Sequence, residues 1–62
     1  MIGKRIRQAR RFRKMTQRDV REKAGLSAGF FSDLENDKRS CSALNLFRLA
    51  KALGRTMDWF LR

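Results

Sequence analysis

Apolar side chains recur at helical spacing along most of the chain. Near the N-terminus, Ile2, Ile6 and Ala9 fall on one side of a helix, and the same spacing returns in later segments. No apolar–polar alternation of the kind that predicts a strand lasts four residues, and the chain has no Pro. The pattern predicts helices over residues 2–13, 17–24, 28–35, 43–53 and 57–62. We therefore expect a compact all-α fold of five helices in one domain, residues 1–62.

Side chains that stabilise helix ends mark the boundaries of these segments. A Ser or Thr precedes four of them in the N-cap position: Thr16, Ser27, Ser42 and Thr56. Gly25 and Gly54 follow two of them, where a left-handed residue commonly ends a helix. Phe12 lies off the apolar stripe of the first helix. We expect it to fold onto the core as a flank, with an exposed contact as the alternative.

Residues 16–36 have the arrangement of a helix-turn-helix motif. The segments 17–24 and 28–35 are separated by a short turn that contains Gly25. Two helices joined by such a turn are typical of DNA-binding proteins. The second helix, 28–35, would then enter the major groove.

The charge of the chain is strongly positive. Lys and Arg number 16 against six Asp and Glu, which gives a net charge of +10. A small folded domain of this charge is typical of proteins that bind a polyanion, most often nucleic acid. The alternative is a basic, solvated surface without a partner. A membrane-surface helix at residues 2–13 is disfavoured because its apolar side is narrow.

The chain lacks the residues on which most enzymes and metal sites depend. It has no His and a single Cys, Cys41, which we interpret as an incidental thiol. No nucleophile–base arrangement and no Gly-rich phosphate loop is present. We expect no enzymatic activity, no metal and no cofactor. No apolar run approaches a membrane span or a signal-peptide core, so we expect a cytoplasmic, nucleoid-associated protein.

Several sequence pieces, in order, resemble one family nearly from end to end. They are IGKRIRQAR, TQRDV, EKAGLS, FFSDLEN, KR, LAKALG and MDWFL. The ordered set is similar to the phage lambda repressor and Cro (XRE-type) family of helix-turn-helix proteins. The resemblance implies a five-helix domain that binds double-stranded operator DNA, usually as a homodimer.

The resemblance also assigns roles to individual residues. It places base contacts at Ala28, Gly29, Ser32 and Asp33. It places phosphate contacts at Gln17, Arg18, Ser27, Lys38, Arg39 and Ser40. It implies a partly buried salt bridge between Arg10 and Glu35. Candidates for a dimer interface are Leu44, Met57, Trp59, Phe60 and Leu61, with a core position favoured for Trp59.

The base-reading positions carry unusually spare chemistry. Arg, Lys, Gln and Asn make the strong bidentate contacts to bases, and none of them is present there. We therefore expect affinity to come mainly from phosphate contacts. The alternative is that these are simply small solvent-facing residues.

Four positions depart from the family pattern. Lys14 and Asp37 stand where the family often has Gly, and Cys41 replaces a frequent Pro. Arg21 occupies a site that is usually Ala, so its stem must run along the seam between the two motif helices.

The sequence thus predicts a sequence-specific DNA-binding transcriptional regulator, with repression as the expected activity. The alternative is an antitoxin-type module that binds DNA and also a protein partner, such as a toxin or another regulator.

Overall fold

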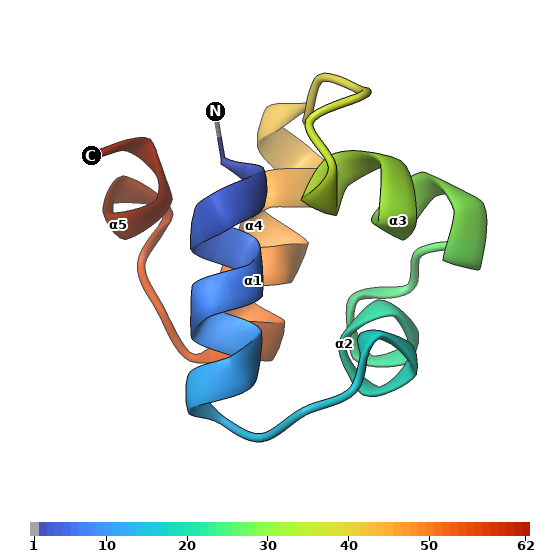
Figure 1. Ribbon diagram of the computed structural model, residues 1–62. Coiled ribbons are helices and arrows are strands. Elements are labelled where there is room, and N and C mark those ends of the chain that lie inside the picture. Colours follow the sequence, from blue (N-terminus) through green and yellow to red (C-terminus); the bar gives the residue numbers. More distant parts are fainter. Residues whose placement is uncertain (1) are drawn as a thin grey trace.

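The computed structural model describes residues 2–62, and it forms five helices without strands in that range (Figure 1). The helices are α1 (Gly3–Phe12), α2 (Gln17–Ala24), α3 (Ala28–Glu35), α4 (Ala43–Leu53) and α5 (Met57–Leu61). The all-α prediction is confirmed, and the predicted bounds of α2, α3 and α4 match those of the structure. The outer helices are shorter than predicted. Ile2 and Arg13 are the caps of α1, and Arg62 is the C-cap of α5.

Four of the helices begin at a hydroxyl cap. The side-chain oxygens of Thr16, Ser27, Ser42 and Thr56 each accept a hydrogen bond from a backbone amide in the first turn, at 3.0–3.2 Å. In α2 the cap is reciprocal, because the backbone amide of Thr16 donates to Asp19 Oδ2 at 2.9 Å. This hydrogen bond, with that from the Thr16 hydroxyl, lowers the pKa of Asp19 from its usual 3.8.

Left-handed residues end four of the helices or follow them closely. Gly25 and Gly54 have φ angles of 73° and 67° and cap α2 and α4, as predicted. Lys14 and Asp37 also have positive φ, at 56° and 57°. These are the two positions where the resembled family often has Gly. A side chain in this conformation costs about 1–2 kcal/mol, less for Asp than for Lys.

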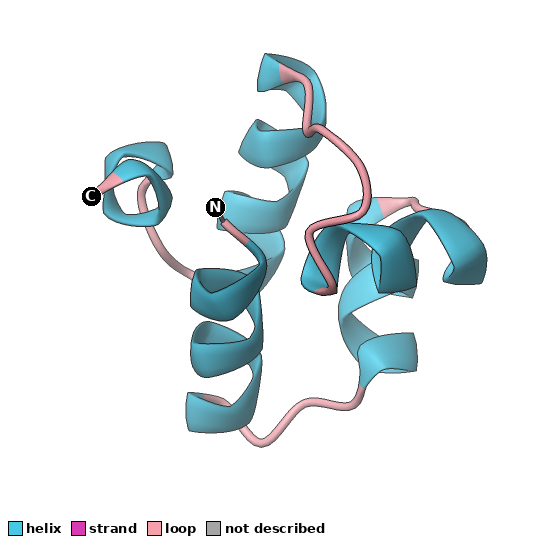
Figure 2. Cartoon of the chain, turned by 45° about the horizontal axis from the view of Figure 1, so that its top comes forward, coloured by secondary structure: helices cyan, strands magenta, loops and turns pink. Residues whose placement is uncertain are grey.

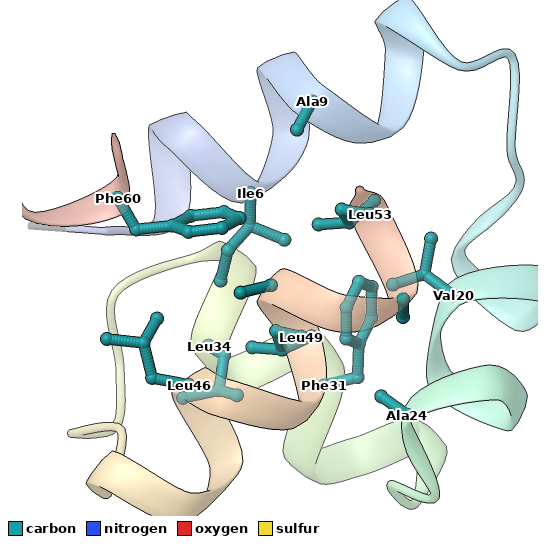
Figure 3. Close-up of a cluster of buried hydrophobic side chains, with 12 residues drawn as sticks. Ile6, Ala9, Val20, Ala24, Phe31, Leu34, Leu46, Leu49, Leu53 and Phe60 are labelled. Atoms are coloured by element: carbon teal, nitrogen blue, oxygen red, sulfur yellow. The ribbon is translucent and has the colours of Figure 1, made fainter. Parts of the chain in front are cut away.

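The core receives side chains from all five helices (Figure 3). Helix α4 packs against α1, α2 and α5, while α3 packs against α1 and α2. The labelled core residues are Ile6, Ala9, Val20, Ala24, Phe31, Leu34, Leu46, Leu49, Leu53 and Phe60. Phe60 is 2% exposed, so the prediction that it lies at a dimer interface is wrong for this conformation. It is instead the buried side chain of α5 and attaches that helix to the core together with partly buried Met57 and Trp59.

Phe12 does not fold onto the core as predicted, because it is 74% exposed. It lies in the last turn of α1, and one side of its ring is covered by the guanidinium of Arg55, 5.2 Å from the ring centroid. The same guanidinium lies 4.6 Å from the ring centroid of Trp59, and Arg5 lies 4.8 Å from it. Trp59 is half-buried and packs against the core. Cation–π contacts from Arg5 and Arg55 therefore cover part of the ring surface of Phe12 and Trp59.

Candidate nucleic-acid interface

The turn between α2 and α3 is fixed by the backbone. The amide of Leu26 donates to the carbonyl of Arg21 at 2.8 Å, and the amide of Gly25 donates to Glu22 at 3.2 Å. Leu26 packs against the core cluster. Val20 and Ala24 are buried in α2, as Phe31 is in α3, so the angle between the two helices is set by packing.

A buried carboxylate joins the motif to α1. Glu35 Oε2 lies 2.6 Å from Arg10 Nε, and Oε1 accepts from Gln17 Nε2 at 2.8 Å. The side chains of Arg10 and Glu35 are 14% and 3% exposed. Arg7 donates to the backbone carbonyl of Glu35 at 2.6 Å. These four residues, Arg7, Arg10, Gln17 and Glu35, form what we call the Glu35 junction, which connects α1, α2 and α3.

The Glu35 junction agrees with part of the sequence prediction and adds to it. The expected ion pair between Arg10 and Glu35 is present. Gln17 was expected on a phosphate. It is exposed, and its side-chain amide nitrogen donates to the buried carboxylate of Glu35. The amides of Gln17 and Arg18 precede the first backbone bond of α2, from Val20 to Thr16, and so remain suited to an anion. Within residues 2–62, every buried side-chain nitrogen or oxygen has a hydrogen-bond partner.

The close backbone contact between Gly3 of α1 and the end of α3 was not predicted. A Cβ on Gly3 would collide with the carbonyl oxygens of Glu35 and Leu34, so only Gly fits there. Asp37 Oδ1 accepts a hydrogen bond from the Gly3 amide at 3.0 Å and so caps α1 from the loop after α3. No local signal reveals this cap, because the two residues are far apart in sequence and Ile2 offers no capping oxygen.

The predicted base contacts lie on one outward side of α3, which we call the reading face: Ala28, Gly29, Ser32 and Asp33. The first two residues are exposed and the last two half-exposed. A Cβ on Gly29 would meet no atom within 4 Å. The Asp33 carboxylate lies 3.7 Å from Arg39 Nε, so a predicted base contact and a predicted phosphate contact are paired with each other. Arg39 also lies over the ring of Phe30, 5.3 Å from its centroid.

The remaining predicted phosphate contacts lie at three places: the loop after α3, the start of α2 and the N-cap of α3. Lys38, Arg39 and Ser40 are exposed on the loop of residues 36–42, which Figure 2 shows passing from α3 to α4. Arg18 is exposed at the start of α2 and pairs with Glu22 at 3.2 Å. The hydroxyl of Ser27 accepts the cap bond from Phe30. Exposed ion pairs such as Arg18–Glu22 and Arg39–Asp33 contribute little to stability. Their cations can therefore turn to a phosphate at small cost.

Comparisons with known proteins agree with this geometry. A family model described as a helix-turn-helix domain matches residues 3–62. This chain belongs to that helix-turn-helix family. The immunity repressor of Bacillus phage phi105 is 42% identical over 53 residues, which is 86% of this chain and 37% of the repressor. An HTH-type transcriptional regulator of Sinorhizobium fredii is 33% identical over 54 residues, 87% of this chain and 70% of the regulator. No solved structure is a significant match.

Across residues 2–62, no cluster of three His, Cys, Asp or Glu side chains could hold a metal ion. No helix in the same range is long and apolar enough to cross a membrane. Cys41 is half-buried, and burial raises the pKa of its thiol. A raised pKa disfavours the reactive thiolate.

Proposed function

We propose that this domain is a sequence-specific transcriptional regulator that binds double-stranded DNA and acts as a repressor. One arrangement carries the proposal. The outward side of α3 is open to solvent, while the Glu35 junction holds the C-terminal end of α3 against α1 and α2. A helix presented in this way fits the major groove. The names of the two relatives support a regulator rather than an enzyme, and that of the phage protein supports repression.

Phosphate contacts would supply most of the affinity. The first-turn amides of α2 and the side chains of Lys38, Arg39 and Ser40 would grip the backbone on the two sides of the groove. The net charge of +10 supports this, because each neutralised phosphate releases counterions. On binding, Arg39 would exchange Asp33 for a phosphate.

Base contacts would be few and short. Ala28 suits the methyl group of thymine, and Ser32 can bond to several bases. Asp33, once released by Arg39, could accept a hydrogen bond from the amino group of cytosine. Gly29 would allow close approach of the backbone. We therefore expect modest discrimination between sequences.

A homodimer on DNA completes the proposal. A cleft of about 210 Å³ includes Ile2, Leu46 and Leu61 in its lining, together with Asp37 and Arg39, which carry opposite charges. A face of this mixed charge can pair with a second copy of itself across a two-fold axis. Leu61 is the exposed apolar side chain of this cleft, and Met57 and Trp59 are further candidates for the dimer interface. Half-sites would then lie one helical turn apart.

Selection of bound duplexes from a random pool tests the proposal. We expect a short palindrome with few fixed positions. The variant Ser32→Ala should change the selected positions, whereas Lys51→Ala, which removes a cation from exposed α4 surface, should leave them unchanged. A flat profile for the unmodified protein would contradict sequence-specific binding. It would favour the antitoxin-type alternative, in which the main partner is a protein.

A further inference from the structure

The outward side of α4 carries a row of exposed side chains that the core does not use. Leu44, Phe47, Arg48 and Lys51 are spaced at i, i+3, i+4 and i+7, so they share one side of the helix. Leu44 and Phe47 are 58% and 50% exposed. Two large apolar side chains on one exposed helix side are a feature of protein-binding surfaces.

A cleft lies beside this row, between α4 and α2. It has a volume of about 410 Å³, and its lining includes Phe47, Ala52 and three cations, Lys23, Arg48 and Lys51. The ammonium of Lys51 lies 5.8 Å from the ring centroid of Phe47. Within residues 2–62, the four ion pairs involve Arg10, Arg18, Arg39 and Arg62 and none of these three cations. The cleft is therefore an apolar floor with a positive rim that no acidic group of this part of the chain neutralises.

The surface is separate from the predicted DNA contacts. We call it the α4 face: Lys23, Leu44, Phe47, Arg48, Lys51 and Ala52. None of these residues belongs to the reading face, the Glu35 junction or the loop of residues 36–42. On α2, Gln17 points to Glu35, whereas Lys23 lines the cleft toward α4. A partner could therefore bind the α4 face while α3 lies in the major groove of DNA.

We propose that the α4 face docks an acidic amphipathic helix of a partner protein. Leu44 and Phe47 would pack against the apolar side of that helix, as in other helix-in-groove complexes. Its Asp and Glu side chains would pair with Lys23, Arg48 and Lys51, which would also steer the encounter. This goes beyond DNA binding, because it gives the domain a second partner, and it does not depend on which DNA sequence is bound.

Charge decides between this occupant and a second copy of the chain. A symmetric dimer through the α4 face would bring the same three cations of each copy together, which opposes association. The cleft around Leu61 differs, because Asp37 and Arg39 give it both signs of charge. The α4 face therefore fits an acidic partner better than it fits itself.

A peptide titration tests the proposal. The probe is a synthetic amphipathic helix with Leu on one side and Glu on the other, added to the ¹⁵N-labelled full chain without DNA. We expect saturable NMR shift changes at residues 44–52 and Lys23. A peptide with Lys in place of Glu, or with the same composition scrambled, should bind at least about tenfold more weakly. Equal binding of the scrambled peptide, or changes spread over the whole basic surface, would overturn the proposal.

Matched variants locate the binding. Phe47→Ala and Arg48→Glu should each lower the affinity for the acidic peptide about tenfold. Lys4→Glu makes the same charge change on the exposed surface of α1 and should lower the affinity less than about twofold. Equal losses for Arg48→Glu and Lys4→Glu would show general charge attraction and overturn the site. Two other results would also overturn it. One is self-association of the free protein that Phe47→Ala abolishes, and the other is a DNA duplex that perturbs the same residues.

Discussion

The Glu35 junction and the reading face belong to the same motif and are built in opposite ways. In the junction, a carboxylate that is 3% exposed accepts from Arg10 and Gln17, on two other helices. On the reading face, two small residues project into solvent, and Asp33 forms only a 3.7 Å pair with Arg39. The polar groups that are hardest to replace thus position α3, while those that would meet the bases are few. This difference predicts that α3 is held rigidly but discriminates weakly between DNA sequences.

Removing Glu35 should have the largest effect on stability. Glu35→Ala leaves the partly buried Arg10 without its counter-charge. Breaking one partner of a buried ion pair in this way lowers the free energy of unfolding by about 3–5 kcal/mol. Urea unfolding followed by circular dichroism measures the change. The double variant Arg10→Met/Glu35→Leu should lose clearly less, because it buries no unpaired charge. Equal losses in the single and double variants would contradict this role for the ion pair.

Gly3→Ala should be the next most damaging change. Its Cβ would collide with the backbone carbonyls of Glu35 and Leu34, and these atoms cannot move without shifting α3. Overpacking of this kind costs about 1–3 kcal/mol. Thermal unfolding of the variant checks the prediction. An unchanged melting temperature would show that α1 can move away from α3 freely.

Gly29→Ala makes the opposite prediction for the reading face. Gly29 is helical and its φ is not among the positive values, and an added Cβ would meet no atom within 4 Å. Ala is a better helix former than Gly by about 1 kcal/mol, so the variant should be more stable by up to that amount. Differential scanning calorimetry of the variant measures this. A loss of stability would mean that the reading face is more constrained than its exposure indicates.

Asp19→Asn should have the smallest effect, and one that depends on pH. The folded-state pKa of Asp19 is lowered by hydrogen bonds from Thr16, so its charged form stabilises the folded protein. That contribution is present above the usual pKa of 3.8 and is lost as the pH falls through the lower folded-state value. The unmodified protein should therefore be the more stable near neutral pH, and the difference should vanish in strong acid. A difference that stays constant with pH would contradict the assignment.

The sequence predicts the helices well because their signals are local. The hydroxyl caps and Gly25 and Gly54 act within one turn, so α2, α3 and α4 begin and end where predicted. The Arg10–Glu35 pair followed from resemblance alone, and the bond from Gln17 to the same carboxylate was missed. Contacts between distant segments leave no such signal. The Gly3–Asp37 cap, the burial of Phe60 and the exposure of Phe12 each depend on how the helices come together.

The candidate site was predictable as a set of positions rather than as an arrangement. The residues of the reading face do share one side of α3. The ion pair between Asp33 and Arg39 was not predicted, because Asp33 lies on α3 and Arg39 lies on the irregular loop that follows it. Leu44 was predicted as a surface contact, but as part of a dimer interface. The α4 face as a whole was not predicted, because its cleft also needs Lys23 from α2, which is distant in sequence.

The salt dependence of DNA binding tests the central claim most directly. Affinity should be measured over a range of salt concentrations for a selected duplex and for a random one, with the unmodified protein and with Asp33→Ala. We expect steep slopes that are nearly equal for the two duplexes, at about 0.9 for each phosphate neutralised. Asp33→Ala should bind the random duplex more tightly, because it removes a negative charge and releases Arg39. A shallow slope for the selected duplex, with a large preference over random DNA, would contradict the account.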